Sequence, residues 1–425
     1  MISGPGPCLR NLRHMNELAR PFAALRPRQQ TAQAVIAPPY DVVDVEEARA
    51  LAAGRPESFL HISRPEIDLP QGTDPYSDEV YATGARNLKN LIERQVLERE
   101  RSACYYVYRM TAGDHSQTGV AIAASINAYQ SGSIHRHELT RPDKENDRVR
   151  NIETLNAQTG PVLLTYKRDK NVADLLDEAT LSAPLLDATG QHDVRHTVWR
   201  IDGASRIAAL TSAINSLGDL YIADGHHRSA AAARVASDRQ GAGSTRTEPH
   251  DYFLSVAFPD DQMQIFDYNR VVCDLNGLTS DEFMLAVREA FTIDPVSGPA
   301  KPEATGSFGM YLDGHWHRFR SKKPPNSDDP VARLDVSVLQ QQLIEPILGV
   351  RDPRTDGRIG FVGGVRGLKE LERRVDQGTA AVAFALYPTG IRDLMAVADA
   401  ALLMPPKSTW FEPQLADGLL THVIG

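Results

Sequence analysis

The sequence predicts a mixed α/β or α+β fold that is divided into at least two domains. The chain has 425 residues, which is more than one hydrophobic core ordinarily organises. Short apolar segments rich in β-branched and aromatic residues alternate with segments of helical spacing along most of the chain. No long uninterrupted series of strand–helix units occurs, so a purely parallel sheet is not expected.

In the N-terminal half, five elements follow from apolar spacing and from the glycine and proline residues that end them. Asp114 lies in the turn that joins the last two strands into a hairpin. The expected elements are a strand at 33–37, a helix at 45–53, a strand at 59–62, a helix at 81–98 and a hairpin over 104–127.

Further along, strands and helices alternate in the same way. We expect Asp313-Gly314 to close a hairpin, because this dipeptide favours tight turns between strands. The expected elements are a helix at 151–158, strands at 161–166 and 251–258, a hairpin over 307–320, a helix at 338–348, a strand at 359–364, a helix at 368–375, a strand at 380–387 and a helix at 391–402.

These elements suggest three regions. Residues 1–20 begin without a periodic pattern and are expected to be a disordered N-terminal extension. Residues 21–240 carry the motifs that bear chemistry and are expected to form the catalytic region. A polar, glycine-containing stretch at 240–250 separates them from a C-terminal α/β region at 251–425.

Composition excludes several classes of function. The content of 42% hydrophobic and 24% charged residues is typical of a globular enzyme. The net charge of −9 argues against a general nucleic-acid-binding protein. No apolar run is long enough to span a membrane. Three widely spaced cysteines provide no disulfide or metal framework, so a cytoplasmic location is expected, while the oligomeric state stays open.

The first candidate site is the run Asp224-Gly225-His226-His227-Arg228, which lies between an apolar strand and an alanine-rich helix. Backbone N–H groups at a helix N-terminus attract anions, and the histidines and the arginine add side-chain donors for phosphate or carboxylate. The alternative is a structural corner with Asp224 as the helix N-cap.

The second candidate site is the charged stretch at 135–148. Arg141, Lys144 and Arg148 have the charge to hold phosphates. His137, Glu138 and Asp147 are residue types that act as acids, bases or magnesium ligands. The alternative interpretation is a solvated loop that leads into a helix.

The histidines of the two charged motifs also raise the alternative of a metal site. His135, His137, His226 and His227 would supply enough imidazoles for zinc or iron, but their spacing matches no known metal motif. Magnesium that arrives with a nucleotide needs few protein ligands, so we expect no metal held by the protein alone.

Two proline-containing segments complete the set of candidates. The stiff turn Pro38-Pro39-Tyr40-Asp41 could present Tyr40 or Asp41 to a substrate. The segment Lys407-Ser408-Thr409 has the composition of a phosphate-binding trio but lacks the glycine-rich loop of a Walker motif.

Taken together, these motifs resemble one family. The chain is similar, from about Pro21 to its C-terminus, to the prokaryotic family labelled domain of unknown function 1015. The motifs that carry the resemblance are Ala37-Pro38-Pro39-Tyr40-Asp41-Val42, His137-Glu138-x-Thr140, Asp143-Lys144-Glu145-x-Asp147-Arg148, Ala223-Asp224-Gly225-His226-His227-Arg228 and Met404-Pro405-Pro406-Lys407-Ser408-Thr409.

The Asp-Gly-His-His-Arg element also resembles the nucleotide-binding loop of the ParB/sulfiredoxin-like superfamily. That resemblance implies a ParB/sulfiredoxin-like core with an additional C-terminal region. Some ParB-like proteins phosphorylate free L-serine, so it also implies a small-molecule kinase. The sulfiredoxin cysteine, the ParB arginine box and a DNA-binding helix-turn-helix are absent from the sequence.

The sequence therefore predicts a kinase that transfers a phosphoryl group from a nucleotide to a free hydroxy amino acid, with serine as the first candidate and magnesium as the cofactor. The alternatives are a non-catalytic nucleotide-binding regulator and a metal-dependent phosphatase or hydrolase. The expected catalytic residues are Glu138, Asp147, His137 and Asp224; the expected phosphate-binding residues are Gly225, His226, His227, Arg228, Lys144 and Arg148; the expected substrate-binding residues are Tyr40, Asp41, Thr140, Lys407, Ser408 and Thr409.

Overall fold

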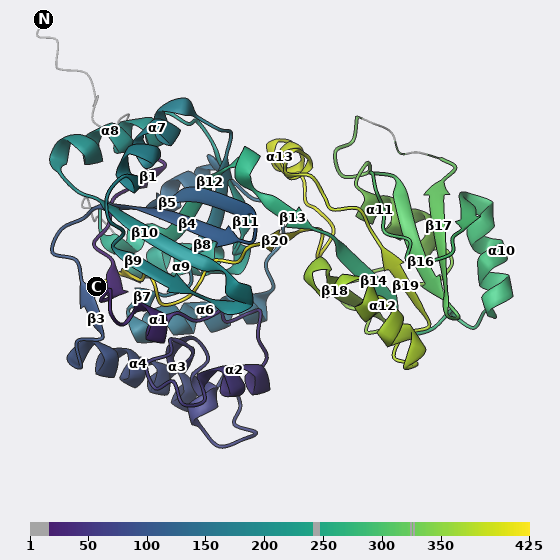
Figure 1. The fold of residues 1–425 in the computed structure, drawn as a ribbon, viewed down its shortest axis with the longest axis horizontal. Helices are drawn as coiled ribbons and strands as arrows, with labels where there is room; N and C mark the ends of the chain where they lie inside the picture. The colour runs from purple at the N-terminus through teal and green to yellow at the C-terminus, as the bar shows by residue number, and fades with distance from the viewer. Residues whose placement is uncertain (1–16, 241–246, 324, 326–327) are drawn as a thin grey trace, which may run out of the picture. The chain divides into compact units, whose positions relative to one another are not determined.

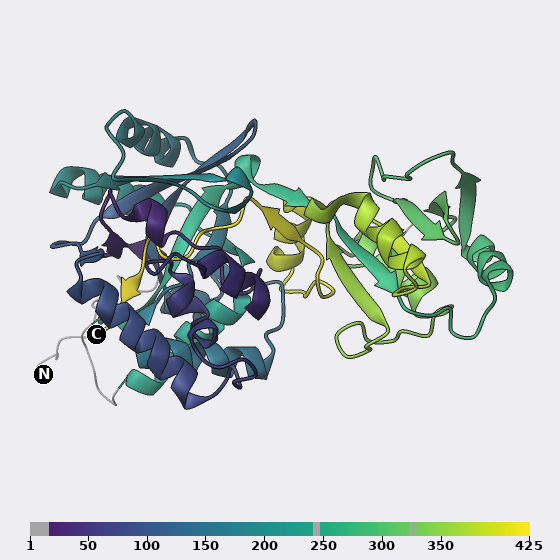
Figure 2. The ribbon, with the colours of Figure 1, turned by 60° about the horizontal axis from the view of Figure 1, so that its bottom comes forward.

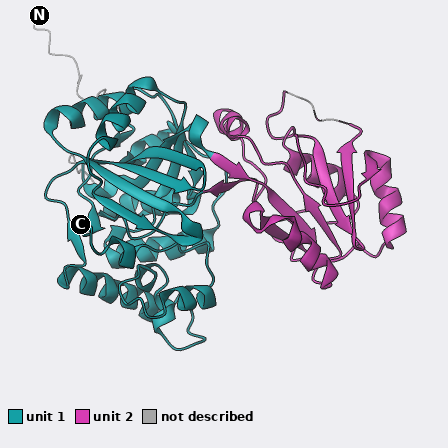
Figure 3. Ribbon diagram, in the orientation of Figure 1, with its two compact units in different colours: residues 1–263, 413–425 teal, residues 264–412 magenta. Residues whose placement is uncertain are grey.

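The structure is a computed structural model that describes residues 17–240, 247–323, 325 and 328–425. The chain folds into two compact units of mixed α/β type, shown in Figures 1 and 3. Unit 1 comprises residues 1–263 and 413–425, and unit 2 comprises residues 264–412.

Unit 1 is built on a nine-stranded mixed sheet with the order β6-β11-β8-β12-β5-β4-β10-β9, in which β1 also pairs with β5. β11 is parallel to β6 and β8 is parallel to β12, whereas the other pairs are antiparallel. The strands are β1 (Ala19–Arg20), β4 (Tyr105–Ala112), β5 (His115–Ser125), β6 (Ile134–His135), β8 (Val162–Tyr166), β9 (Leu186–Thr189), β10 (Arg195–Ile201), β11 (Leu220–Asp224) and β12 (Tyr252–Pro259).

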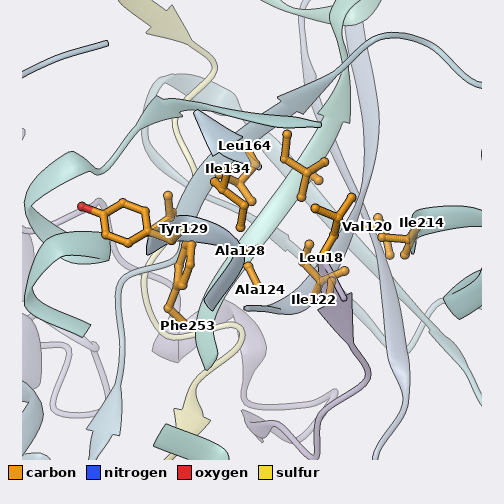
Figure 4. Packing of buried hydrophobic residues seen from close by; sticks show 14 of the residues in the cluster. Leu18, Val120, Ile122, Ala124, Ala128, Tyr129, Ile134, Leu164, Ile214 and Phe253 are labelled. Atoms are coloured by element: carbon orange, nitrogen blue, oxygen red, sulfur yellow. The ribbon is translucent and has the colours of Figure 1, made fainter. Parts of the chain in front are cut away.

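Helices pack against this sheet through one large apolar core, part of which is seen in Figure 4. The core joins alternate strand residues such as Val120 and Ile122 to helix residues such as Ile214, as the two-residue period of strands requires. The helices of unit 1 are α1 (Ala32–Val35), α2 (Val45–Ala52), α3 (Leu60–Ser63), α4 (Asp78–Glu93), α5 (Ile126–Ser131), α6 (Pro142–Leu155), α7 (Lys170–Thr180), α8 (Ala204–Asn215) and α9 (His226–Arg239).

Two short segments that the sequence predicts as strands are helical. The segments at 33–37 and 59–62 form α1 and α3. Runs of four or five apolar residues fit a buried helical turn as well as a strand, so periodicity alone does not distinguish them. Here the Phe59 N–H donates to the Val35 carbonyl at 2.8 Å, and both residues belong to a second apolar core, formed largely by α2, α3 and α4.

The C-terminal segment, residues 413–425, returns to unit 1 and lies among its N-terminal elements, as the yellow end of the chain in Figure 2 shows. β21 (His422–Val423) pairs with β7 (Ala157–Gln158), and β2 (Leu25–Pro27) pairs with β3 (Leu97–Arg99). Single bridges also join Leu25 to Thr421 and Ala37 to Asp417. This return places Asp417 beside Ala37, at the start of the Pro38-Pro39 turn.

Unit 2 has a six-stranded sheet with the order β15-β17-β16-β19-β14-β18, and a separate pair of β13 with β20. Asp313 and Gly314 both have positive φ and close the β16–β17 hairpin, as the sequence predicts. The elements are β13 (Gln264–Phe266), β14 (Tyr268–Val272), α10 (Ser280–Ala290), β15 (Phe291–Pro295), β16 (Ser307–Leu312), β17 (His315–Ser321), α11 (Asp335–Leu339), β18 (Ile359–Gly363), α12 (Gly367–Asp376), β19 (Val382–Ala385), α13 (Ile391–Asp399) and β20 (Trp410–Glu412).

The expected domain limits differ from the observed units in three places. The boundary follows Met263 instead of falling at 240–250, because β12 pairs with β5 and β8 inside the sheet of unit 1. Residues 413–425 belong to unit 1 instead of the C-terminal region. Of the expected N-terminal extension, residues 1–16 lie outside the described part, whereas Ala19–Arg20 form β1 on the sheet. None of the described helices is long and apolar enough to cross a lipid bilayer.

Candidate functional site

The Asp-Gly-His-His-Arg run forms a tight connection between β11 and α9. Gly225 is the N-cap of α9 and has φ +101°, a conformation that favours glycine. A Cβ atom at this position would lie 3.1 Å from Arg228 Nε. As the N-cap residue, Gly225 has no side chain that could accept from the first backbone N–H groups of α9.

Arg228 is buried beneath this turn. Its guanidinium donates to the Pro161 carbonyl and forms an ion pair with Asp224, and Asp41 Oδ2 lies 3.9 Å from Nη2. Burial disfavours the charged form of Arg228 and tends to lower its pKa. The negative charges of Asp224 and Asp41 have the larger effect, so the pKa of Arg228 lies above its ordinary value. Arg228 therefore holds the turn and the neighbouring carboxylates in place, and its guanidinium is already engaged before any phosphate arrives.

The structure brings the two charged motifs together. The His137 backbone N–H faces His226 Nε2 at 3.4 Å, and the Arg141 backbone N–H donates to His227 Nε2 at 3.0 Å. The His137 and His226 rings meet edge to face, with centroids 4.5 Å apart. The loop that carries His137 to Arg141 is thus docked onto the N-terminal turn of α9.

Burial keeps both facing histidines neutral near pH 7. It lowers the pKa of His137 to about 4. It also lowers the pKa of His226 well below the ordinary value, with the cationic forms of His137 and His227 acting in the same direction. With Nε2 of His226 accepting the backbone contact, its proton lies on Nδ1, which is 3.8 Å from Glu138 Oε2. Glu138 is half-exposed and lies beside the helix end.

Asp147 has both carboxylate oxygens occupied. Oδ1 accepts from the Tyr81 hydroxyl at 2.7 Å, and Oδ2 accepts from Arg148 Nη2 at 2.7 Å and from Nε at 3.0 Å. The Arg148 guanidinium lies 3.9 Å above the centre of the Tyr40 ring. Asp147 therefore orients Arg148, instead of facing open space as the expected catalytic base would.

Residues on α6 fix the charged loop against α9. Thr140 Oγ1 donates to Glu145 at 2.9 Å, and Glu145 in turn pairs with Arg234 of α9 at 2.9 Å. Lys144 Nζ donates to the Tyr76 hydroxyl at 3.0 Å. Thr140, an expected substrate-binding residue, thus has a partner within the protein.

Sequence reasoning missed Asp417, which the returning C-terminal segment places beside these residues. Asp417 is 1% exposed, and its carboxylate forms no ion pair or side-chain hydrogen bond among the described residues. Burial raises its pKa to about 7; Arg228, Arg148 and the Tyr40 backbone N–H act against this rise, and Asp41 adds to it. A single carboxylate in the apolar run Leu415 to Leu420 was the signal available in the sequence.

Lys407, Ser408 and Thr409 belong to unit 2, whereas the other candidate residues belong to unit 1. Ser408 Oγ donates to the Pro405 carbonyl at 2.6 Å, and Lys407 Nζ lies 5.8 Å from the centre of the Tyr268 ring. These contacts are those of a compact turn within unit 2.

The four histidines of the charged motifs do not converge on one metal-binding position. They are His135, His137, His226 and His227. His135 stacks on Tyr221, with ring centroids 4.9 Å apart, and its Nε2 lies 3.2 Å from Asp219. In the described part of the chain, no three histidine, cysteine or acidic side chains are arranged to share a metal ion. The geometry thus gives no support to the alternative of a histidine-built metallohydrolase.

Comparisons with solved structures give distant likenesses. A conserved hypothetical protein from Pyrococcus furiosus is 12% identical with a TM-score of 0.34, covering 73% of this chain and 97% of its own. A free serine kinase in complex with ADP is 13% identical with a TM-score of 0.34, covering 71% and 89%. SbnI from Staphylococcus aureus, truncated at its C-terminus, is 13% identical with a TM-score of 0.38, covering 71% and 87%.

No curated protein matches the sequence. The family model described as "Protein of unknown function (DUF1015)" matches residues 19–337, about three quarters of the chain. That span includes the Pro38-Pro39 turn, the charged loop and the strand–glycine–helix turn. The chain therefore belongs to the DUF1015 family.

Proposed function

We propose that unit 1 is a phosphotransferase that moves a phosphoryl group from a nucleotide to the hydroxyl group of a small metabolite, with free serine as the first candidate. One observation carries this proposal: the N-terminus of α9, which begins at a glycine, lies directly beside the docked loop of His137 to Arg141. Backbone N–H groups at a helix end bind phosphate oxygens, and phosphoryl transfer needs chiefly positioning and charge neutralisation.

The roles of individual residues follow from their surroundings. Gly225 allows the left-handed turn that begins α9 and the close packing of Arg228 and Val162 against it, and so fixes the direction of the first backbone N–H groups. Arg136, whose exposed side chain lies 5.1 Å from the centre of the Tyr129 ring, precedes the docked loop and supplies positive charge, whereas the Arg141 guanidinium is paired with Asp143 at 2.8 Å. Glu138 is the half-exposed carboxylate beside the helix end, and we assign it the proton of the attacking hydroxyl. Magnesium, brought with the nucleotide, would neutralise phosphate charge.

Arg228 and Arg148 take a different role from the one expected from the sequence. Arg228 pairs with Asp224, and Arg148 pairs with Asp147. Each arginine therefore holds its neighbouring segment in place. A positioning role of this kind preserves the geometry of the helix end, on which phosphate binding depends.

The test is a phosphate-transfer screen of the full chain with magnesium, several nucleotides and free hydroxy amino acids, read by mass spectrometry. We expect a phosphorylated product with the wild type, and a loss of about a hundredfold or more in rate for Glu138→Gln with nucleotide affinity retained. Nucleotide binding without any product would instead support a non-catalytic nucleotide-binding regulator. Absence of nucleotide binding would overturn both functions.

A further inference from the structure

Two adjoining cavities in unit 1, the arginine cavities, are lined by residues that the candidate site does not use. The larger has a volume of about 550 Å³ and the smaller about 360 Å³. Arg26, Glu98, Arg200 and Asp202 line both cavities. Small-molecule sites have volumes of roughly 300–1,000 Å³, so this space is large enough for a ligand.

The charges that line the arginine cavities are unbalanced. Six arginines and three acidic residues give a net charge of +3, in a chain whose net charge is −9. A local excess of positive charge in an acidic protein indicates a site for anions. The arginines are Arg26, Arg28, Arg99, Arg101, Arg200 and Arg206, and the acidic residues are Glu98, Glu100 and Asp202.

Four of the arginines belong to one alternating chain of ion pairs, with N–O distances of 2.6 to 3.3 Å. In order, its members are Arg28, Glu98, Arg26, Glu100, Arg200, Asp202 and Arg206. Arg28 and Arg206 end the chain, so each pairs with one carboxylate, whereas the inner arginines pair with two. Both end residues line the larger cavity, and their side chains are 36% and 51% exposed. Their remaining N–H groups are available to a bound anion.

The smaller cavity adds two arginines that lie outside this chain of ion pairs. Arg99 is the last residue of β3, Arg101 lies two residues further on, and both are exposed. Neither side chain forms an ion pair or a hydrogen bond with another described residue. The planar guanidinium group matches two oxygens of a phosphate or a carboxylate. Each cavity therefore has guanidinium groups with free donors at its border.

The lining favours a ligand that has phosphate groups and no aromatic ring. None of the described residues that line either cavity is aromatic, so a nucleobase would find no side chain on which to stack. Gln29, Gln30 and Ser182 add neutral polar groups to the larger cavity. Because guanidinium groups border both adjoining cavities, a molecule with two or more phosphate groups can place one in each.

The arginine cavities lie at a distance from the proposed transfer site. Arg200 is on β10, whereas the Asp-Gly-His-His-Arg turn follows β11, and β4, β5, β12 and β8 lie between these two strands in the sheet (Figure 1). Neighbouring strands are about 4.8 Å apart, so β10 and β11 are separated by roughly 24 Å. A small ligand in the arginine cavities would not reach the N-terminus of α9.

We propose that the arginine cavities bind a small non-aromatic molecule with two or more phosphate groups, such as a short inorganic polyphosphate. This site is separate from the one assigned to phosphoryl transfer. The inference does not depend on the proposed function, because none of its residues takes part in that function.

The test is isothermal titration of the full chain with inorganic tripolyphosphate. For the double variant Arg99→Gln/Arg101→Gln we expect binding to weaken about tenfold or more, with ADP affinity unchanged. The matched control is Arg366→Gln/Arg392→Gln, which removes two exposed arginines from unit 2 and changes the net charge by the same amount. We expect the control to bind tripolyphosphate as the wild type does.

A variant with the opposite effect makes the test decisive. Asp202→Asn removes the carboxylate that Arg200 and Arg206 share, so their guanidinium groups become available to the ligand. We expect this variant to bind tripolyphosphate several-fold more tightly than the wild type. A loss of folding cannot produce tighter binding, so this result does not depend on the stability of the double variant.

Four outcomes would overturn the inference. The first is no binding of tripolyphosphate to the wild type at millimolar concentration, and the second is equal weakening in the double variant and its control. The third is binding that Gly225→Ala abolishes and Arg99→Gln/Arg101→Gln retains, since the anion would then lie at α9. The fourth is citrate binding as tightly as tripolyphosphate, which would contradict the choice of phosphate. The expected responses support the inference whether or not the chain transfers a phosphoryl group.

Discussion

Arg228 in unit 1 and Arg270 in unit 2 are both buried guanidinium groups, but their surroundings are opposite. Asp224 and Asp41 lie around Arg228 and raise its pKa. Arg270 is 4% exposed, donates to the Tyr268 and Pro406 carbonyls, and lies 5.0 Å from the centre of the Phe361 ring. Burial lowers its pKa to about 10, and no carboxylate of the described residues opposes this.

The difference separates two uses of a buried arginine. Arg270 closes a turn through backbone carbonyls and an aromatic face, which is a structural task. Arg228 concentrates carboxylates beside a helix end and a cavity, and such clusters of perturbed groups occur mostly at functional sites. The comparison therefore supports the proposal that unit 1 carries the chemistry, and four paired substitutions test it, from the largest expected effect to the smallest.

Removing the two guanidinium groups should have unequal effects. Arg228→Met leaves buried and half-buried carboxylates without a counter-charge, so we expect a loss of about 3–5 kcal/mol in the free energy of unfolding, together with loss of nucleotide binding. Arg270→Met removes a charge that has no carboxylate partner, and should cost only about 1 kcal/mol. Chemical denaturation of the full chain measures both. Equal losses would contradict the contrast drawn here.

The two buried carboxylates with raised pKa values predict a pH dependence of stability. Burial raises the pKa of Asp417 and of Asp335 to about 7, so the folded chain binds more protons than the unfolded chain between about pH 4 and 7. Stability therefore falls as the pH rises through this window. Asp417→Asn and Asp335→Asn should each raise the free energy of unfolding at pH 8, by up to about 4 kcal/mol, and have little effect at pH 4.

The glycines at two tight turns should also respond unequally. Gly225→Ala must adopt φ +101° with its Cβ 3.1 Å from Arg228 Nε, so we expect a cost of about 2 kcal/mol and weaker nucleotide binding. Gly314→Ala, in the hairpin of unit 2, has φ +77° and open space around it, so we expect about 1 kcal/mol and unchanged binding. Denaturation and nucleotide titration measure the two effects. Unchanged binding by Gly225→Ala would place the phosphates elsewhere.

The smallest contrast concerns two tyrosine–aspartate pairs. Tyr81 donates to Asp147 at 2.7 Å, and Tyr311 donates to Asp376 at 3.0 Å. Each Phe substitution should cost about 1 kcal/mol of stability. Only Tyr81→Phe should lower the transfer rate, since Asp147 orients Arg148. If Tyr311→Phe lowered the rate as much, the site would extend beyond the residues assigned to it.

Much of the fold followed from local patterns. The hairpin at Asp313-Gly314 and the strand–glycine–helix turn at Gly225 were predicted, because each rests on backbone preferences of a few adjacent residues. The strands predicted at 33–37 and 59–62 were wrong, because a short apolar run forms a strand or a helix according to the residues against which it packs. The unit boundary was misplaced because the pairing of β12 is a long-range property.

The amino-acid sequence alone determined the family, the mixed α/β character and the identity of the two charged motifs, because these depend on residue type, order and short-range spacing. Only the tertiary structure decided which of those charges remain available. In the folded chain, Arg228 pairs with Asp224, and Arg148 pairs with Asp147. The returning C-terminal segment places Asp417 beside Ala37. Burial and pairing set the chemistry of a charged group, and both arise from contacts between residues far apart in the sequence.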